Sequence, residues 1–80
     1  MIGEMVNFKD YCNEIYTSKV IGIFSDKHEN VKFLDKNVVY WSKKGKKYRK
    51  LKENDMNSIY LEVESSRGKT DFITLDEVIT

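Results

Sequence analysis

The sequence contains no proline and only four glycines, so no segment has the composition of a linker between domains. It has one cysteine, Cys12, whereas a small secreted domain would normally carry several cysteines in pairs. The longest uninterrupted apolar run, Val38 to Trp41, is far shorter than the roughly 20 residues that a membrane-spanning helix needs. The N-terminus shows no basic region followed by an apolar one, so no signal peptide is predicted. We therefore expect a cytoplasmic protein that does not contact a membrane.

Residues suited to catalysis are also scarce. The single histidine, His28, is far from Cys12 in the sequence, so neither a zinc site nor a Cys–His nucleophile pair has enough members. We expect His28 to be exposed in a turn and Cys12 to be buried as a small hydrophobic side chain. The carboxylates Asp71, Asp76 and Glu77 would need a cleft for acid–base chemistry or Mg²⁺ binding, and a chain of 80 residues has little room for one. We predict a protein that is not an enzyme and that holds no metal or cofactor.

A chain of this length is one domain, residues 1–80, and it buries only about two thirds of its unfolded surface. Hydrophobic residues make up 40% of it and charged residues 34%, which is too apolar for a disordered chain. Such a domain can hold one sheet with one helix packed on it.

The segment 4–17 has the pattern of an amphipathic helix. Met5, Phe8, Cys12, Ile15 and Tyr16 recur at spacings of three and four residues, with polar residues mainly between them. A helix of this length is marginal by itself, so we expect its apolar face to pack on a sheet.

From residue 18 onward the pattern is that of short strands separated by polar turns. Apolar, β-branched and alternating runs predict strands at about 20–25, 31–34, 38–43, 47–52, 58–64 and 70–75. Gly68 is free to take positive φ in a turn, and Thr74 and Glu77 have capping-box spacing. The predicted fold class is α+β, with one N-terminal amphipathic helix packed on a five- to six-stranded antiparallel sheet or small open barrel.

The strongest functional signal is the charge of the segment WSKKGKKYRKLK, residues 41–52. Seven of the ten residues 43–52 are basic and none is acidic, whereas the other 70 residues hold 7 basic and 13 acidic side chains, a net charge of −6. The overall net charge of +1 hides this asymmetry. We predict a lysine-rich β-hairpin over residues 38–52.

The register of this hairpin has two solutions. A turn centred on Lys44 and Gly45 pairs Trp41 with Tyr48, whereas a three-residue turn pairs Trp41 with Arg49. The slip would reverse the face on which Tyr48 and its neighbours lie. The sequence does not choose between the two.

The cations of the hairpin repel each other at a cost of a few tenths of a kcal/mol or more for each cross-strand pair. Solvent and salt can screen them, carboxylates such as Glu62 and Glu64 can neutralise them, or an external anion can bind. Lysines suit sequence-independent contacts with phosphates, and outward-facing aromatic side chains could stack on bases. The leading hypothesis is therefore a non-catalytic nucleic-acid-binding protein. Its candidate binding residues are Trp41, Lys43, Lys44, Lys46, Lys47, Tyr48, Arg49, Lys50 and Lys52.

Two further hypotheses fit the charge of the hairpin. The amino-acid composition, which lacks proline and is rich in Lys, Asn, Ile and Tyr, is similar to that of small accessory proteins from AT-rich bacterial or phage genomes. Such proteins often block a larger protein. This resemblance implies a regulator or inhibitor of a larger protein. It would bind an acidic partner through the hairpin, or it would mimic DNA with its acidic surface and so bind a protein that normally binds nucleic acid. Alternatively, the lysines keep a sheet edge from pairing with other chains. Either a monomer or a homodimer is compatible with an open sheet of this size.

A short stretch, Asp55-Met56-Asn57 followed by Ile59 and Leu61, resembles part of the first signature of Sm-like RNA-binding proteins. Ser66-Arg67-Gly68 is similar to the Arg-Gly of the second signature, and the resemblance implies that Asn57 and Arg67 contact RNA. The glycine expected in the preceding strand is missing and the Asp-to-Met spacing differs, so we assign no family.

Overall fold

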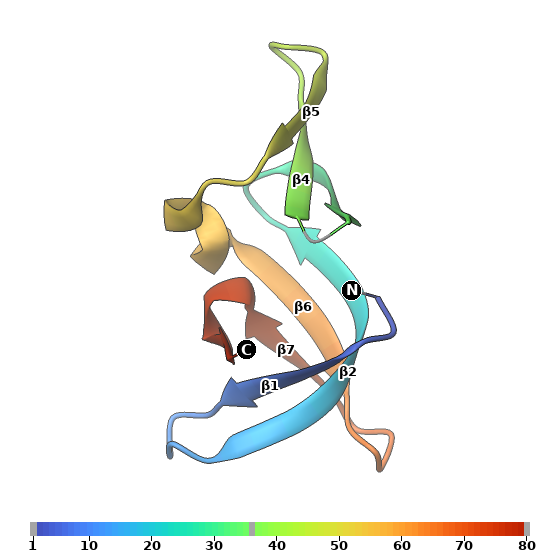
Figure 1. Ribbon diagram of the computed structural model, residues 1–80, viewed down its shortest axis with the longest axis vertical. Coiled ribbons are helices and arrows are strands. Elements are labelled where there is room, and N and C mark those ends of the chain that lie inside the picture. The colour runs from blue at the N-terminus through green and yellow to red at the C-terminus, as the bar shows by residue number, and fades with distance from the viewer. Residues whose placement is uncertain (1, 36, 80) are drawn as a thin grey trace.

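The computed structural model describes residues 2–35 and 37–79, and it consists of strands with two short 3-10 helices (Figure 1). The elements in chain order are β1 (Met5–Lys9), β2 (Ile15–Ser25), β3 (Glu29–Leu34), β4 (Asn37–Ser42), β5 (Lys47–Lys50), η1 (Glu53–Ser58), β6 (Ile59–Glu64), β7 (Thr70–Thr74), η2 (Leu75–Glu77) and β8 (Val78–Ile79). None of the helices in the described ranges is long and apolar enough to cross a membrane.

The core lies on the inner face of a curved five-stranded antiparallel sheet with the order β7-β6-β2-β1-β8. Its centre is the pairing of β2 with β6, in which Val20 lies opposite Val63 and Ile23 lies opposite Leu61. Alternation along β6 turns Ile59, Leu61 and Val63 inward, where all three are buried. Side chains from β1, β7 and η2 complete the core.

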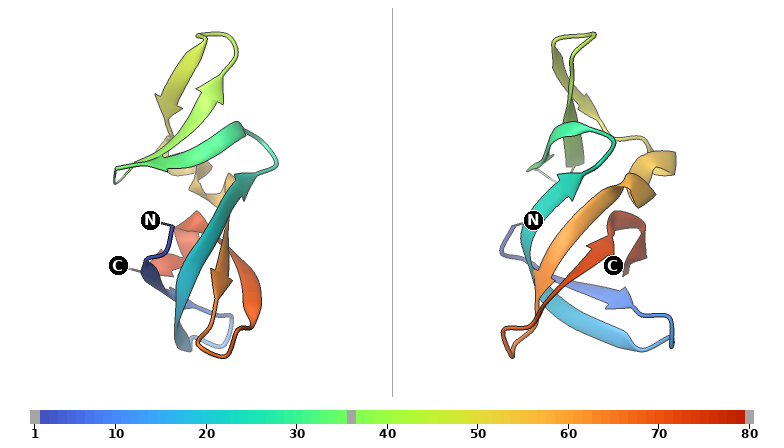
Figure 2. Two further views of the ribbon diagram at one scale, coloured as in Figure 1. Left: turned by 90° about the vertical axis from the view of Figure 1, so that its right-hand side faces the viewer. Right: turned by 180° about the vertical axis from the view of Figure 1, so that it is seen from behind.

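The remaining strands form a second, smaller antiparallel sheet with the order β3-β4-β5. Its base is attached to the body, because Phe33, Val38 and Leu51 pack against the core. The hairpin of β4 and β5 extends beyond this base and stands clear of the five-stranded sheet in each view (Figures 1 and 2). This projection accounts for the elongated shape, 41 × 22 × 20 Å.

The predicted N-terminal helix over 4–17 is wrong, and with it the α+β assignment. The segment forms β1, a turn and the first part of β2, so the expected strand at 20–25 begins at Ile15. Of the five residues in the predicted apolar stripe only Phe8 is buried, whereas Met5 and Ile15 are exposed. Cys12 is also exposed, in the turn, contrary to its expected burial. In β1 buried and exposed side chains alternate with a period of two, and Val6 and Phe8 face inward.

Polar residues between the two strands explain why this segment turns. The Asp10 carboxylate accepts hydrogen bonds from the backbone N–H groups of Cys12 at 2.9 Å and Glu14 at 3.0 Å. Asn13 takes a left-handed conformation with φ 62°, which asparagine tolerates better than most residues. The turn places Ser18 opposite Val6, so that both strands join the sheet over the core.

The exposed edge of β7 is protected by its own carboxylates. The backbone N–H of Phe72 donates to Asp71 Oδ1 at 2.8 Å, and that of Thr74 donates to Glu77 Oε1 at 3.0 Å. The second bond belongs to the expected capping box, which starts η2 at Thr74. Since these N–H groups are satisfied within the chain, the edge is a poor template for pairing with another strand.

The core is thin, so removing a single central side chain should unfold much of the population. Leu61 is 0% exposed, and its replacement by alanine should cost about 2–5 kcal/mol of unfolding free energy. Leu34 is 52% exposed, and the matched Leu34→Ala change should cost less than about 0.5 kcal/mol. Urea denaturation followed by tryptophan fluorescence measures both. Similar losses for the two variants would contradict this placement of the core.

Candidate functional site

The structure selects one of the two registers of the basic hairpin, defined here as residues 38–52. Trp41 lies opposite Tyr48 and Tyr40 lies opposite Arg49. The turn therefore comprises residues 43–46, and the Leu51 N–H donates to the Val38 carbonyl at 2.9 Å to extend the pairing toward the body. All seven cations of the segment are exposed: Lys43, Lys44, Lys46, Lys47, Arg49, Lys50 and Lys52.

The tip of the hairpin is closed by short-range contacts. The Gly45 N–H donates to the Ser42 hydroxyl oxygen at 3.2 Å, and Lys46 takes a left-handed conformation with φ 51°. A Cβ atom on residue 45 would come within 3.2 Å of the Arg49 guanidinium. The glycine therefore leaves room for Arg49 to fold back over the turn.

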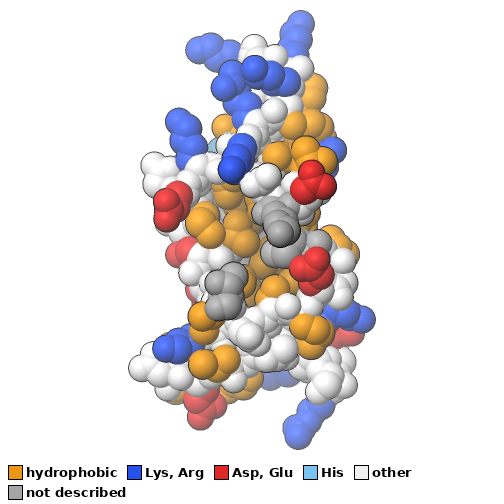
Figure 3. All heavy atoms as spheres, in the orientation of Figure 1, with side chains coloured by type: hydrophobic (Ala, Val, Ile, Leu, Met, Phe, Trp, Pro, Cys, Tyr) orange, Lys and Arg blue, Asp and Glu red, His pale blue; other side chains and the backbone are white. Residues whose placement is uncertain are grey.

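Most of the cations border a single hollow, which we call the basic groove. It has a volume of about 560 Å³ and is lined by Tyr40, Ser42, Lys44, Lys47, Tyr48, Arg49, Lys50 and Lys52. Five of the seven hairpin cations are in this set, and blue side chains gather over this end of the molecule (Figure 3). An open, strongly positive groove with two tyrosines in its lining suits a phosphate-bearing chain better than an apolar ligand.

Lys43 is held away from this groove by a carboxylate of β3. Its ammonium lies 2.9 Å from Glu29, and this hydrogen bond raises the pKa of Lys43. Among the described residues, no ion pair connects Glu62 or Glu64 of β6 with the hairpin, although the sequence suggested them as neutralising groups. The cations of the basic groove therefore face solvent without carboxylate partners from the described part of the chain.

The aromatic side chains of the hairpin are already engaged within the molecule. The rings of Trp41 and Tyr48 meet edge to face at 5.2 Å, and the ammonium of Lys32 lies 4.1 Å from the centre of the Tyr48 ring. The Tyr40 ring stacks on His28 at 4.1 Å. Their ring faces are thus less available for stacking on bases than the sequence suggested, and the hairpin offers mainly charge.

His28 lies in the turn between β2 and β3, as predicted, but the prediction that it is exposed is wrong. Its side chain is mostly buried, and Nε2 lies 3.5 Å from Asp55 Oδ2 in η1. Asp55 also pairs with Lys27 at 2.6 Å, and the Ser25 hydroxyl donates to the Ser58 carbonyl at 2.8 Å. These contacts join the turn between β2 and β3 to η1 and so fix the base of the hairpin to the body.

Sequence inspection missed an exposed aromatic cluster on the outer face of the five-stranded sheet. Phe24, Tyr60 and Phe72 come from the neighbouring strands β2, β6 and β7. The rings of Phe24 and Tyr60 stack at 5.3 Å, and Phe24 meets Phe72 edge to face at 5.5 Å. Phe24 is 45% exposed and Phe72 is 56% exposed. Only the outward position of Tyr60 followed from local alternation, because the cluster depends on pairing between strands.

The two positions suggested by the Sm-like resemblance do not form one site. Asn57 lies in η1, before β6, and Arg67 lies in the turn after β6, so the length of that strand separates them. Across the described residues, no group of three or more His, Cys, Asp or Glu side chains is arranged to hold a metal ion. Comparison of the chain with protein-family models, curated proteins and solved structures found no match. The chemistry of the site therefore follows from its own geometry alone.

The ion pair between Lys27 and Asp55 predicts that acid lowers the stability of the fold. The hydrogen bond from Lys27 lowers the pKa of Asp55, so the folded state favours the ionised carboxylate. The resulting stabilisation is present above the unfolded-state pKa, near 3.8, and is lost as the pH falls through the lower folded-state value. The Asp55→Asn variant should therefore be less stable at neutral pH and lose less stability on acidification than the parent. Urea midpoints between about pH 6 and pH 2 measure this, and parallel curves would contradict the contribution of Asp55.

Proposed function

We propose that this protein binds nucleic acid through the basic groove of the hairpin, contacting phosphates without reading base sequence. The observation that carries the proposal is the gathering of Lys44, Lys47, Arg49, Lys50 and Lys52 around one open groove. An exposed and unpaired Cys12 agrees with a cytoplasmic location, where thiols are kept reduced. No reaction is part of the proposal.

The projection of the hairpin supports this function on energetic grounds. Charges at an exposed tip are screened by water and salt, so their mutual repulsion costs little stability. The same projection lets the cations reach a nucleic-acid backbone before the negatively charged body approaches it. Counterions released from the nucleic acid would then drive binding, and its affinity would fall steeply with salt.

The composition of the groove favours backbone contacts over base contacts. Four of its five cations are lysines, which act as point charges, and only Arg49 can form a planar two-pronged contact with a phosphate. The ring faces of Tyr40 and Tyr48 are in contact with His28 and Lys32. We therefore expect little preference among base sequences.

The first experiment is fluorescence anisotropy with labelled single-stranded DNA, single-stranded RNA and duplex DNA. Five phosphate contacts predict a loss of affinity of roughly 100- to 500-fold between about 50 and about 200 mM salt. The variant with Lys47, Arg49 and Lys50 all changed to Gln should lower the slope of log affinity against log salt by about 2 to 3. Its affinity should fall to a similar extent for every sequence tested.

A matched control separates the groove from net charge. Changing Lys9, Lys19 and Arg67 to Gln also removes two lysines and one arginine from exposed positions, but none of the three lines the basic groove. This control should keep most of the affinity and the salt slope of the parent. Equal losses in the two triple variants, or no binding at the lower salt, would contradict the proposal. Light scattering on each variant checks that removing lysines from β5 has not caused aggregation.

A second candidate function is protein binding, which the exposed cluster of Phe24, Tyr60 and Phe72 favours. Aromatic side chains dominate the binding energy of protein interfaces, and Glu62 and Glu64 follow Tyr60 on the same outward face of β6. This surface would suit a partner with basic residues around an apolar centre, as a blocking protein would require. The double variant Phe24→Ser and Phe72→Ser should leave nucleic-acid affinity unchanged if the groove is the nucleic-acid site and the cluster serves a protein partner. A large loss of nucleic-acid affinity would contradict this division between the two surfaces.

A further inference from the structure

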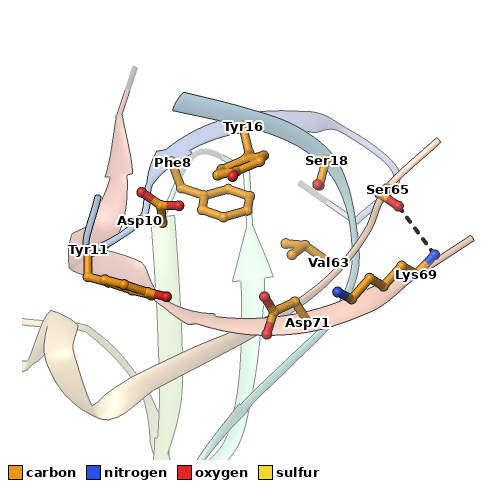
Figure 4. Close-up of a pocket in the computed structure, with 9 residues that line it drawn as sticks. All are labelled: Phe8, Asp10, Tyr11, Tyr16, Ser18, Val63, Ser65, Lys69 and Asp71. Atoms are coloured by element: carbon orange, nitrogen blue, oxygen red, sulfur yellow. Dashed lines mark hydrogen bonds between the residues drawn. The ribbon is translucent and has the colours of Figure 1, made fainter. Parts of the chain in front are cut away.

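A cavity at the end of the sheet remote from the hairpin has no part in the proposed function. It has a volume of about 340 Å³ and lies between the turn that joins β1 to β2 and the turn that joins β6 to β7 (Figure 4). Its lining includes Phe8, Asp10, Tyr11, Tyr16, Ser18, Lys69 and Asp71. This volume is at the lower end of the range for small-molecule sites, about 300–1,000 Å³.

Ser18 is a polar residue in a position that packing alone would give to an apolar one. It faces inward on β2, opposite Val6 and in line with Val20, and it is 5% exposed. Its hydroxyl forms no hydrogen bond with any described residue, and it points into the cavity (Figure 4). The hydroxyl oxygen is not among the buried polar atoms that lack a partner, so it is open to the solvent in the cavity and can bond with a ligand that enters.

Two opposite charges also face the cavity without forming an ion pair. Asp71 points inward from β7, where Oδ1 caps the Phe72 N–H and the second oxygen remains available. The Lys69 ammonium lies on the same side, and no ion pair joins it to Asp71 or to another described carboxylate (Figure 4). Asp10, across the cavity, also belongs to the lining, and its Oδ1 holds the turn. The cavity thus presents one ammonium and two carboxylates, and Asp71 is the carboxylate on the same side as Lys69.

The opposite wall is aromatic. The rings of Phe8 and Tyr16 stack at 5.9 Å, and the Tyr16 hydroxyl donates to Glu14 Oε2 at 2.9 Å. This hydrogen bond raises the pKa of Tyr16 to about 12. Tyr11 is 98% exposed at the rim, and its hydroxyl points toward the cavity (Figure 4). An aromatic side chain so exposed contributes little to folding, but it could cover an apolar group bound below it.

From these groups we propose that the cavity binds a free α-amino acid with an apolar side chain. The ligand's ammonium pairs with Asp71, and its carboxylate pairs with Lys69 and accepts a hydrogen bond from Ser18. The ligand's side chain packs against Phe8 and Tyr16, under Tyr11. A ligand bearing only one charge would leave either Asp71 or Lys69 unmatched.

The test is an NMR titration of the full chain with three probes of similar shape: L-phenylalanine, phenethylamine and 3-phenylpropanoate. L-phenylalanine should shift the amide signals of residues 8–11, 16–18 and 69–71, with a dissociation constant of about 1 mM, as expected for so small a ligand. Each singly charged probe should bind at least about tenfold more weakly, since one charge pair is lost. No shifts up to about 20 mM L-phenylalanine, or equally tight binding of either other probe, would overturn the proposal.

Variants assign the roles of the groups. Asp71→Asn keeps an oxygen to cap the Phe72 N–H but removes the charge, and it should weaken L-phenylalanine binding at least about fivefold, as should Lys69→Gln. Asp76→Asn, an exposed change outside the cavity, is the matched control and should bind normally. Tyr11→Ala should weaken binding without changing the urea midpoint, because that side chain is almost fully exposed. Unchanged binding in Asp71→Asn and Lys69→Gln would overturn the assignment of the charged groups. Nucleic-acid affinity should be the same in all of these variants.

Discussion

The fold depends on the exclusion of four side chains from water along the seam between β2 and β6. Val20, Ile59, Leu61 and Val63 are the largest fully buried side chains, and they all come from these two strands. Pairing of β2 with β6 brings residues about 40 positions apart in sequence into register. Every other element is placed by this seam: β1 and β7 widen the sheet, η2 covers it, and the three-stranded sheet attaches at its upper end.

A core of this size leaves most of the chain free of packing constraints, which permits the uneven distribution of charge. The basic hairpin touches the core only through its base, at Val38 and Leu51. Its tip carries cations that would be costly anywhere closer to the seam. All acidic side chains lie outside the hairpin, and two of them, Asp71 and Glu77, cap the exposed backbone of β7. The charged side chains of the body therefore keep the protein soluble and protect the sheet edge. The cations of the hairpin remain available for binding.

Local patterns predicted what local chemistry determines. The alternation in residues 58–64 predicted the strand that became β6, and Gly68 takes positive φ as expected, at 80°. The helix predicted over residues 4–17 was wrong because the position of Phe8 fits the period of two of a strand as well as the period of three to four of a helix. Only the Asp10 turn, together with a partner strand far along the chain, decides between them. The cations of the candidate site could be read directly, whereas the environment of His28, the aromatic cluster and the cavity depend on pairing between strands that no local pattern encodes.

The most direct test of the hairpin as a phosphate-binding surface is a map of backbone amide shifts on addition of a short single-stranded DNA. If the basic groove binds phosphates, the shifts should concentrate in residues 40–52 and disappear as salt is raised. The amides of β1, β7 and η2 should remain unchanged. Shifts centred on Phe24, Tyr60 and Phe72, or no shifts in the hairpin at low salt, would contradict phosphate binding by the hairpin.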